Sequence, residues 1–282
     1  MTGHPPVRAR RTRRWAVHAV LCAGLLVMAA PFVWMGLSAF KTDEELGASP
    51  TVWIPTEWTL EHFRELLELL DMAQHFFNSA FVATVVTLCN LVFCSMLGYA
   101  LAKLRFAGKR PVFALVLGAL MVPGNLMLMP MFVLMSRMEL IDSYAALILP
   151  FAAGAFGVFL MRQFMLAIPD ELLEAARIDG ASEWYIFWRI AMPLVKPALA
   201  TLAIFTFLQS WNNFLWPLVA TNDPEKYTLP VALATFATDP TKADGSNGVL
   251  MAGAFLVVLP VLLVFVVLQR HFTQGIATAG LK

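Results

Sequence analysis

Six long stretches of the 282-residue sequence contain no aspartate, glutamate, lysine or arginine, and this feature restricts the fold more than any other. Each stretch has at least 19 residues, and about 20 apolar residues let a helix cross the hydrocarbon core of a bilayer. Only helices and closed barrels satisfy their backbone polar groups there. Because the stretches lack the alternation of barrel strands, they favour helices. The charge-free stretches cover residues 15–40, 72–102, 111–136, 143–161, 197–222 and 249–269.

We therefore expect an all-α integral membrane protein with six transmembrane helices in one domain, residues 15–270. The composition agrees, since 59% of the residues are apolar and only 14% are charged, against roughly 25% charged in soluble proteins. It excludes a disordered chain and a basic nucleic-acid binder. Residues 1–14 and 271–282 are predicted to be tails, and the spans are predicted at residues 15–40, 74–102, 111–136, 143–162, 197–221 and 249–269.

The basic residues are distributed unequally between the predicted loops. If the N-terminus lies in the cytoplasm, 15 of the 20 lysines and arginines lie on that side of the membrane, as the positive-inside rule expects. Six spans then place both termini inside. The first stretch is longer than the roughly 7–15 apolar residues of a signal peptide, so we expect it to remain as a span.

The longest predicted cytoplasmic loop, residues 162–196, has a helical pattern of its own. Pro169 with acidic residues after it predicts a helix start, and Gly180 predicts its end. A second short helix is predicted from Glu183 to near Pro193. The pair indicates either an ordinary interfacial hairpin or, because small alanines lie near a glycine, a surface that another protein approaches closely.

This loop resembles the EAA loop of ABC importer permeases, in which Glu-Ala-Ala is followed at fixed spacing by glycine, isoleucine and Leu-Pro. Met192 replaces the leucine, a change that conserves volume and polarity. The resemblance extends from about residue 14 to the end, to the MalG-like permeases of the carbohydrate branch, with FLQSWNNFLWPLV resembling their fifth span. Asn213 stands where an acidic residue is common. The matching motif positions are Glu174, Ala175, Ala176, Gly180, Ile190 and Pro193.

The resemblance implies a transport subunit rather than an enzyme, in the plasma membrane of a prokaryote, with the fold of type I importer permeases. Its implied partners are a homologous second permease, two ATP-binding subunits and an extracytoplasmic solute-binding protein. The EAA loop, residues 169–193, is implied to dock on the ATPase through the six motif residues, and the tail QGIATAGLK is implied to touch the ATPase dimer. We expect no catalytic group, metal or cofactor. The sequence contains no phosphate-binding GxxxxGK[ST] loop and no charge near the middle of a span, which favours an external energy source.

The expected cargo is a carbohydrate. The alternatives are glycerol-3-phosphate or another polyol and, more distantly, a self-contained secondary transporter. Polar residues in the predicted spans either line the pathway or bond between helices, worth roughly 0.6–2 kcal/mol each. The candidates for the pathway are Asn90, Asn125, Gln209 and Asn212.

Three further features of the sequence remain. The first two have two interpretations each, and the third has a structural interpretation. Trp211 and Trp216 are expected either to stack on a sugar or to anchor the membrane interface. Leu and Phe at helical spacing in residues 59–70 predict a short helix, which lies on the outer interface or caps the bundle. The three cysteines are expected to be packing residues: Cys22, Cys89 and Cys94.

Overall fold

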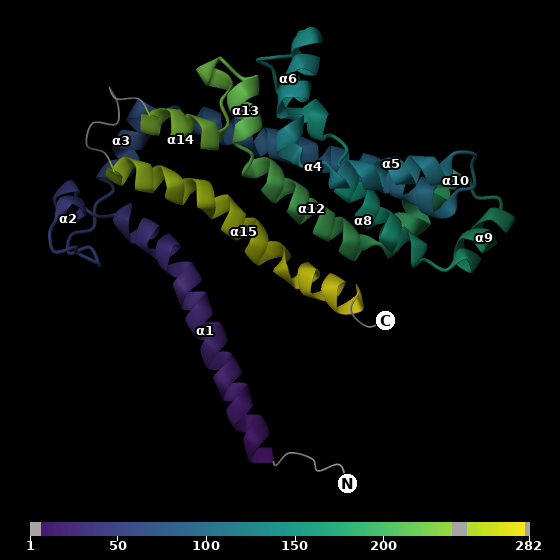
Figure 1. Ribbon diagram of the computed structural model, residues 1–282, viewed down its shortest axis with the longest axis horizontal. Coiled ribbons are helices and arrows are strands. Elements are labelled where there is room, and N and C mark those ends of the chain that lie inside the picture. Colours follow the sequence, from purple (N-terminus) through teal and green to yellow (C-terminus); the bar gives the residue numbers. More distant parts are fainter. Residues whose placement is uncertain (1–6, 239–246, 280–282) are drawn as a thin grey trace. The chain divides into compact units, whose positions relative to one another are not determined.

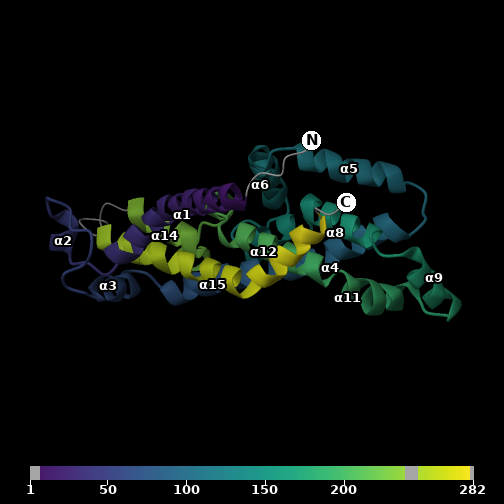
Figure 2. The same cartoon turned by 90° about the horizontal axis from the view of Figure 1, so that it is seen from below.

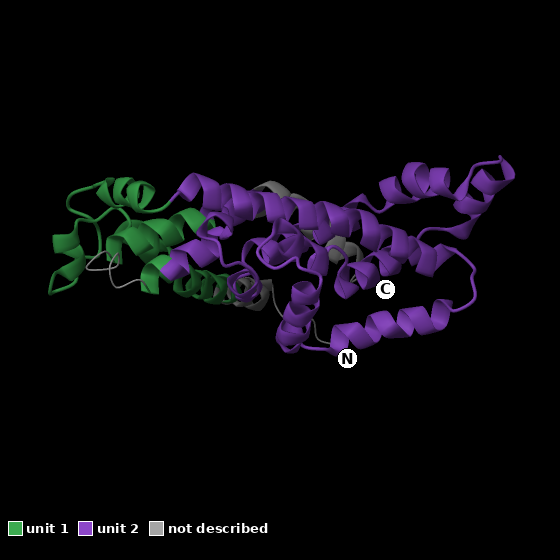
Figure 3. Cartoon of the chain, turned by 90° about the horizontal axis from the view of Figure 1, so that it is seen from above, with its two compact units in different colours: residues 1–70, 236–258 green, residues 71–235, 259–282 purple. Residues whose placement is uncertain are grey.

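The computed structural model describes residues 7–238 and 247–279, and within these ranges helices are the only regular secondary structure. The all-α expectation is therefore confirmed. The chain divides into two compact units, residues 1–70 with 236–258 and residues 71–235 with 259–282 (Figure 3). The ends of both predicted tails and the middle of the predicted outer loop 223–248 lie outside the described residues.

Unit 1 contains α1 (Val7–Ser38), α2 (Asp43–Gly47), α3 (Glu61–Leu69) and the first part of α15 (Asn247–Ala279) (Figure 1). The segment Val17–Ser38 of α1 is 22 residues long, and none of its most apolar window is buried inside the chain. A helix this apolar is stable only where lipid or another apolar protein surface surrounds it.

The chain between α1 and α3 folds around the buried side chain of Lys41. Its Nζ donates a hydrogen bond of 2.7 Å to the carbonyl of Val52 and lies 3.8 Å from the centroid of the Trp34 ring. The helix predicted within residues 59–70 is present as α3. Its Phe63 packs against Phe40 at 5.1 Å and against Phe255 at 6.4 Å between ring centroids, so this part of α3 caps its own unit.

Unit 2 is built on three helices that lie side by side, α4 (Met72–Lys103), α8 (Ala155–Leu166) and α12 (Lys196–Trp211) (Figure 1 and Figure 2). Glycine lets them approach closely. A Cβ atom on Gly98 of α4 would lie 2.8 Å from the Cβ of Met161 on α8, and one on Gly157 of α8 would lie 2.8 Å from the Sγ of Cys94. Small residues at such contacts are typical of packed membrane helices.

Two of the predicted spans, 111–136 and 143–162, are bent, and a third bend lies just before the predicted span 197–221. The segments are bent by 100° between Lys109–Met121 and Gly124–Arg137, by 41° between Tyr144–Phe151 and Ala155–Leu166, and by 81° between Glu183–Leu194 and Lys196–Trp211. The described residues thus hold three helices long enough to cross a membrane, or up to six if each bent pair is one span. The first two bends involve α5 (Lys109–Met121), η1 (Gly124–Met127), α6 (Leu128–Arg137), α7 (Tyr144–Ile148), η2 (Leu149–Phe151) and α8.

The predicted span 197–221 is itself divided into two helices. Its helix α12 ends at Trp211, and a separate helix α13 (Leu215–Ala220) follows after three residues. After α13 come η4 (Pro224–Lys226) and α14 (Leu229–Thr238), whose first residues belong to unit 2. Apolar composition predicted the length of this stretch, but the backbone turns within it.

Candidate functional site

The predicted cytoplasmic loop folds into two short helical segments at one end of unit 2 (Figure 1). The first is α9 (Asp170–Ile178). The second runs without interruption through α10 (Glu183–Tyr185), a π-helix η3 (Ile186–Ala191) and α11 (Met192–Leu194). The two helices expected from the sequence are therefore present.

Gly180 ends α9 because its backbone is in the left-handed conformation. Its φ is +82°, a left-handed conformation that favours glycine. The N–H of Ala181 donates to the carbonyl of Ala176, and the N–H of Gly180 donates to that of Arg177, each at 3.0 Å. This pair of bonds is the Schellman motif. No heavy atom lies within 4 Å of a Cβ added at Gly180, so the backbone conformation and not the available space requires glycine.

The six EAA positions divide into exposed and core-facing residues. Glu174, Ala175, Gly180 and Pro193 are exposed, whereas Ala176 and Ile190 are half-buried and pack against the core of unit 2. On α9, helical spacing places Glu174 and Ala175 on one face with Ile178, whose residue surface is 86% exposed. We call Glu174, Ala175 and Ile178 the exposed face of α9. An exposed apolar side chain beside a carboxylate and a small residue is suited to protein contact.

The π-helix of the second segment is explained by Pro193. Proline has no N–H, and its ring would clash with the carbonyl four residues earlier in a regular helix. In the structure the turn widens just before Pro193, where the N–H of Met192 bonds to the carbonyl of Phe187. Such π-turns accommodate an irregular position without ending the helix.

Both ends of α9 carry ion pairs, and the pKa shifts of the paired groups follow from their partners. Hydrogen bonds from the Arg177 guanidinium and from Tyr99 lower the pKa of the Glu183 carboxyl, and Glu183 in turn raises the pKa of Arg177. The Lys103 ammonium, by hydrogen bond and charge, lowers the pKa of Asp170. The Glu183 and Asp170 carboxylates and the Arg177 guanidinium therefore stay charged at neutral pH.

Sequence reasoning did not identify these partners as a group. From the sequence, Asp170 and Glu183 are recognisable only as residues that favour helix starts. The opposite charges of Arg177 and Glu183 on either side of a glycine turn were a signal for their pairing. For Tyr99 no such signal existed, because its partner is 84 positions away.

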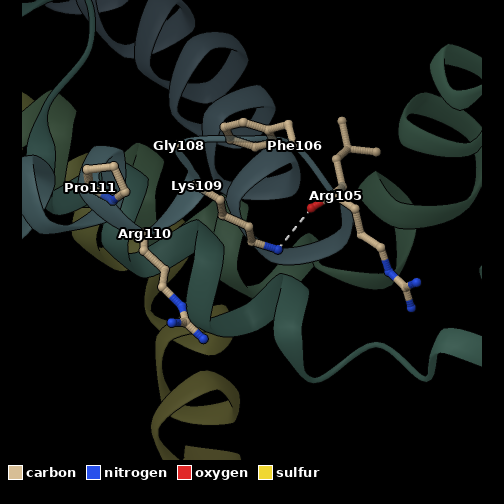
Figure 4. Close-up of a pocket in the computed structure, with 7 residues that line it drawn as sticks. Arg105, Phe106, Gly108, Lys109, Arg110 and Pro111 are labelled. Atoms are coloured by element: carbon tan, nitrogen blue, oxygen red, sulfur yellow. Dashed lines mark hydrogen bonds between the residues drawn. The ribbon is translucent and has the colours of Figure 1, made fainter.

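A basic turn joins α4 to α5 at the same end of unit 2. The Nζ of Lys109 donates to the carbonyls of Ala102 and Leu104, each at 3.0 Å, and so caps the C-terminus of α4. Figure 4 shows Lys109 pointing to one of these carbonyls, with the guanidinium groups of Arg105 and Arg110 extending away from it. Lys109 thus has a structural role within the turn.

Asn90, one of the pathway candidates, is buried and uses every group of its amide inside the chain. Its Nδ2 donates to the carbonyls of Val86 at 2.9 Å and Phe151 at 2.6 Å. Its Oδ1 accepts from the N–H of Gly154 at 2.9 Å and from the thiol of Cys94 at 3.3 Å. Phe151 and Gly154 lie at the break before α8, so Asn90 satisfies backbone groups that the bend leaves unpaired. This is the bonding between helices that the sequence left as the alternative.

The other three pathway candidates have exposed side chains, Asn125 on η1, Gln209 on α12 and Asn212 at the end of α12. The Nδ2 of Asn212 donates to the carbonyl of Leu208 at 2.8 Å. The structure does not gather the four candidates into one site within the chain.

Both interpretations of the two tryptophans were wrong, because both side chains are buried. Trp211 has 1% of its surface exposed and packs against Phe76 and Phe207. Trp216 has 2% exposed, and its Nε1 donates to the carbonyl of Ala146 at 2.9 Å. Of the three cysteines, only Cys94 is fully buried, as packing requires.

Comparison with known proteins identifies the family of this chain. Residues 94–278 match the family model described as binding-protein-dependent transport system inner membrane component. The chain is 38% identical over 256 residues to an arabinooligosaccharides transport system permease protein of Halalkalibacterium halodurans, covering 89% of this chain and 90% of that protein. It is 31% identical over 273 residues to a diacetylchitobiose uptake system permease protein of Streptomyces coelicolor, covering 95% and 90%.

A solved structure agrees with the fold. The structure is described as a bacterial ABC transporter involved in the import of the acidic polysaccharide alginate. One of its chains superposes on this chain with a TM-score of 0.85 at 24% identity, over 96% of this chain and 100% of that one.

Proposed function

We infer the function of this chain from its family, because it belongs to the inner-membrane components of binding-protein-dependent transport systems. Members of this family are permease subunits of transporters and not enzymes. We assign the chain to a bacterial plasma membrane as the permease subunit of an ATP-driven ABC importer. It forms half of the translocation pathway, and ATP hydrolysis takes place in a separate subunit.

A permease subunit of this family works in a complex with several partner subunits. A homologous second permease supplies the other half of the pathway, and the unburied helix α1 is an apolar surface suited to contact with lipid or that partner. Two ATP-binding subunits dock below, and an extracytoplasmic solute-binding protein delivers the cargo. Asn125, Gln209 and Asn212, whose side chains are exposed, are the polar candidates that remain for the wall of the pathway.

Coupling to the ATPase takes place at residues 169–193, and the exposed face of α9 is the contact. Glu174 presents a carboxylate there, Ala175 permits close approach, and Gly180 fixes the turn. The other three motif residues support this surface from within unit 2. Ala176 and Ile190 pack on its core, and Pro193 shapes the π-turn. With α9 in the cytoplasm, the N- and C-termini lie on the cytoplasmic side, as the distribution of basic residues also favours.

The cargo is a carbohydrate, and the observation that carries this assignment is the extent of the similarity. Two relatives aligned over about nine-tenths of their length are named for arabinooligosaccharides and for diacetylchitobiose. These are uncharged oligosaccharides or their derivatives. Glycerol-3-phosphate is the alternative cargo that an uptake experiment must separate.

Replacing Glu174 by arginine tests the assignment of the ATPase contact. The tagged chain is purified in mild detergent from its native host with its partners. We expect Glu174→Arg to reduce the co-purified ATP-binding subunit about tenfold or more, because reversal of a contact charge introduces a repulsive pair. The second permease should remain bound.

Glu68→Arg is the matched control, since Glu68 is also exposed on a short helix, α3, but lies on the side that we assign to the exterior. Its ATPase content should equal that of the unmodified chain. Equal loss from both variants, or no ATP-binding subunit with the unmodified chain, contradicts the proposed contact.

A further inference from the structure

The first end of α9 is fastened to the last turn of α4. Lys103 on α4 has a side chain that is only 5% exposed. Its Nζ donates to the Oδ1 of Asp170, the first residue of α9, at 2.5 Å, and to the carbonyl of Ile168 at 2.6 Å. A lysine buried to this extent loses hydration and holds its position only when its donors are paired.

The second end of α9 is fastened one turn earlier on the same helix. The hydroxyl of Tyr99, a residue with 4% of its surface exposed, donates to the Oε2 of Glu183 at 2.8 Å. Glu183 also accepts from Arg177, in the last turn of α9, through Nε at 2.6 Å and Nη2 at 3.3 Å. One carboxylate thus joins α4, α9 and α10.

The two attachments lie on one face of α4, because Tyr99 and Lys103 are four residues apart. On α9 they lie at opposite ends. Between them the side chain of Leu173, 1% exposed, is packed in the same core as Tyr99 and Leu101. A helix held at one point can pivot, whereas a helix held at two ends over a packed side chain has no free rotation against its support.

We propose that Tyr99 and Lys103 of α4, with Asp170, Arg177 and Glu183, form a two-point clamp that makes α9 and the end of α4 move as one body. This inference rests on the proposed function, since it assumes that the ATPase moves α9. The five residues are positioning residues. Through the clamp, a displacement of α9 becomes a displacement of α4, which packs against both α8 and α12.

The clamp is distinct from the docking surface. Tyr99 and Lys103 are buried behind α9 and do not belong to its exposed face. Their removal should therefore leave the ATPase bound and active while weakening the transfer of its motion. The ratio of transport to ATP hydrolysis reports this difference, since a loss of folded complex lowers both quantities together.

The test uses the complete importer reconstituted in liposomes with its solute-binding protein. The double variant Tyr99→Phe with Lys103→Met removes the donors of both attachments and nearly conserves volume. We expect the ATP-binding subunit to co-purify and to hydrolyse ATP. Uptake per ATP hydrolysed should fall about fivefold or more, a factor that corresponds to a typical coupling free energy between two sites. The single variant Lys103→Arg keeps the charge and the donors, so it should retain most of the coupling.

Lys226→Met is the matched control, because it removes a lysine that is also paired with aspartates, Asp142 and Asp223, but bonds to no residue of the clamp. Its uptake per ATP should equal that of the unmodified importer. If the double variant does not yield a complex, Asp170→Ala with Glu183→Ala removes both carboxylate acceptors from the more exposed side and should also lower uptake per ATP.

Unchanged uptake per ATP in either double variant, with a normal complex, overturns the clamp and leaves the proposed function intact. Failure of the proposed function looks different, because the unmodified chain would then bring no ATP-binding subunit and show no ATP-dependent uptake.

Discussion

Single residues in this chain satisfy backbone groups that the membrane environment cannot hydrate. Asn90 does so at the break before α8, where its amide pairs with one carbonyl and one N–H that no helix uses. Lys109 pairs with the last carbonyls of α4 in a similar way, at the basic turn that follows the predicted span. Each unpaired group in hydrocarbon costs several kcal/mol. A bend within a membrane protein therefore needs a polar side chain placed at it.

Replacing Asn90 by alanine should destabilise the chain by about 1–3 kcal/mol, because buried backbone groups at the break lose their partners. The effect should be a lower melting temperature of the purified complex in detergent. Asn212→Ala, at an exposed asparagine that also bonds to a carbonyl of its own helix, serves as the control and should change the melting temperature little. A changed apparent affinity for cargo with an unchanged melting temperature would instead place Asn90 in the pathway.

Some residue roles followed from the sequence and others did not. Gly180 could be predicted as a helix end because a left-handed residue is needed there whatever surrounds it. Trp211 and Trp216 could not be placed, because composition says that a stretch is apolar but not which side faces the core. Their burial depends on Phe76 and Ala146, which are far away in the sequence.

At the scale of elements, close packing of α4 and α8 depends on glycine at the contact. Gly98 faces the backbone N of Arg162, which would be 2.9 Å from a new Cβ atom. Backbone atoms cannot move aside as the tip of a side chain can. The helices would have to separate along their length.

Gly98→Ala should therefore lower the melting temperature of the complex, with a cost of about 1–3 kcal/mol for the forced separation. Gly118→Ala, on α5, is the matched control because no heavy atom lies within 4 Å of its added Cβ. Since alanine favours a helix over glycine by about 1 kcal/mol, this control should be neutral or stabilising. Similar behaviour of the two variants would show that the contact tolerates a methyl group.

The charge-free stretches predicted where apolar helices occur, but not their breaks. The 100° bend between α5 and η1 comes at Val122 and Pro123, inside a stretch that composition treats as uniform. Hydropathy averages side chains over a window, whereas a break depends on which backbone groups find partners elsewhere in the fold.

At the scale of the whole molecule, this chain is one part of an assembly. The apolar helix α1 is unburied, and three of the four polar pathway candidates are exposed rather than gathered into one site. Both features are expected of a subunit whose pathway closes only against a partner.

The purified chain alone in liposomes should therefore show no uptake with an imposed ion or substrate gradient. The complete importer should take up a neutral oligosaccharide in the presence of ATP and its solute-binding protein, and glycerol-3-phosphate should not compete. Labelled sugar trapped in the liposomes is the measurement. Gradient-driven uptake by the single chain would contradict the subunit assignment, and competition by glycerol-3-phosphate would contradict the cargo.

The sequence by itself determined the all-α membrane class, the position of the apolar helices, the two short helices within residues 162–196 and the family. These depend on composition, local spacing and a motif, which are properties of contiguous residues. Only the tertiary structure decided the bends, the role of Asn90, the burial of the tryptophans and the attachment of α9 to α4. Each of these joins residues tens of positions apart, such as Tyr99 and Glu183. Their partners are set by how the helices pack in space, and no local pattern encodes that.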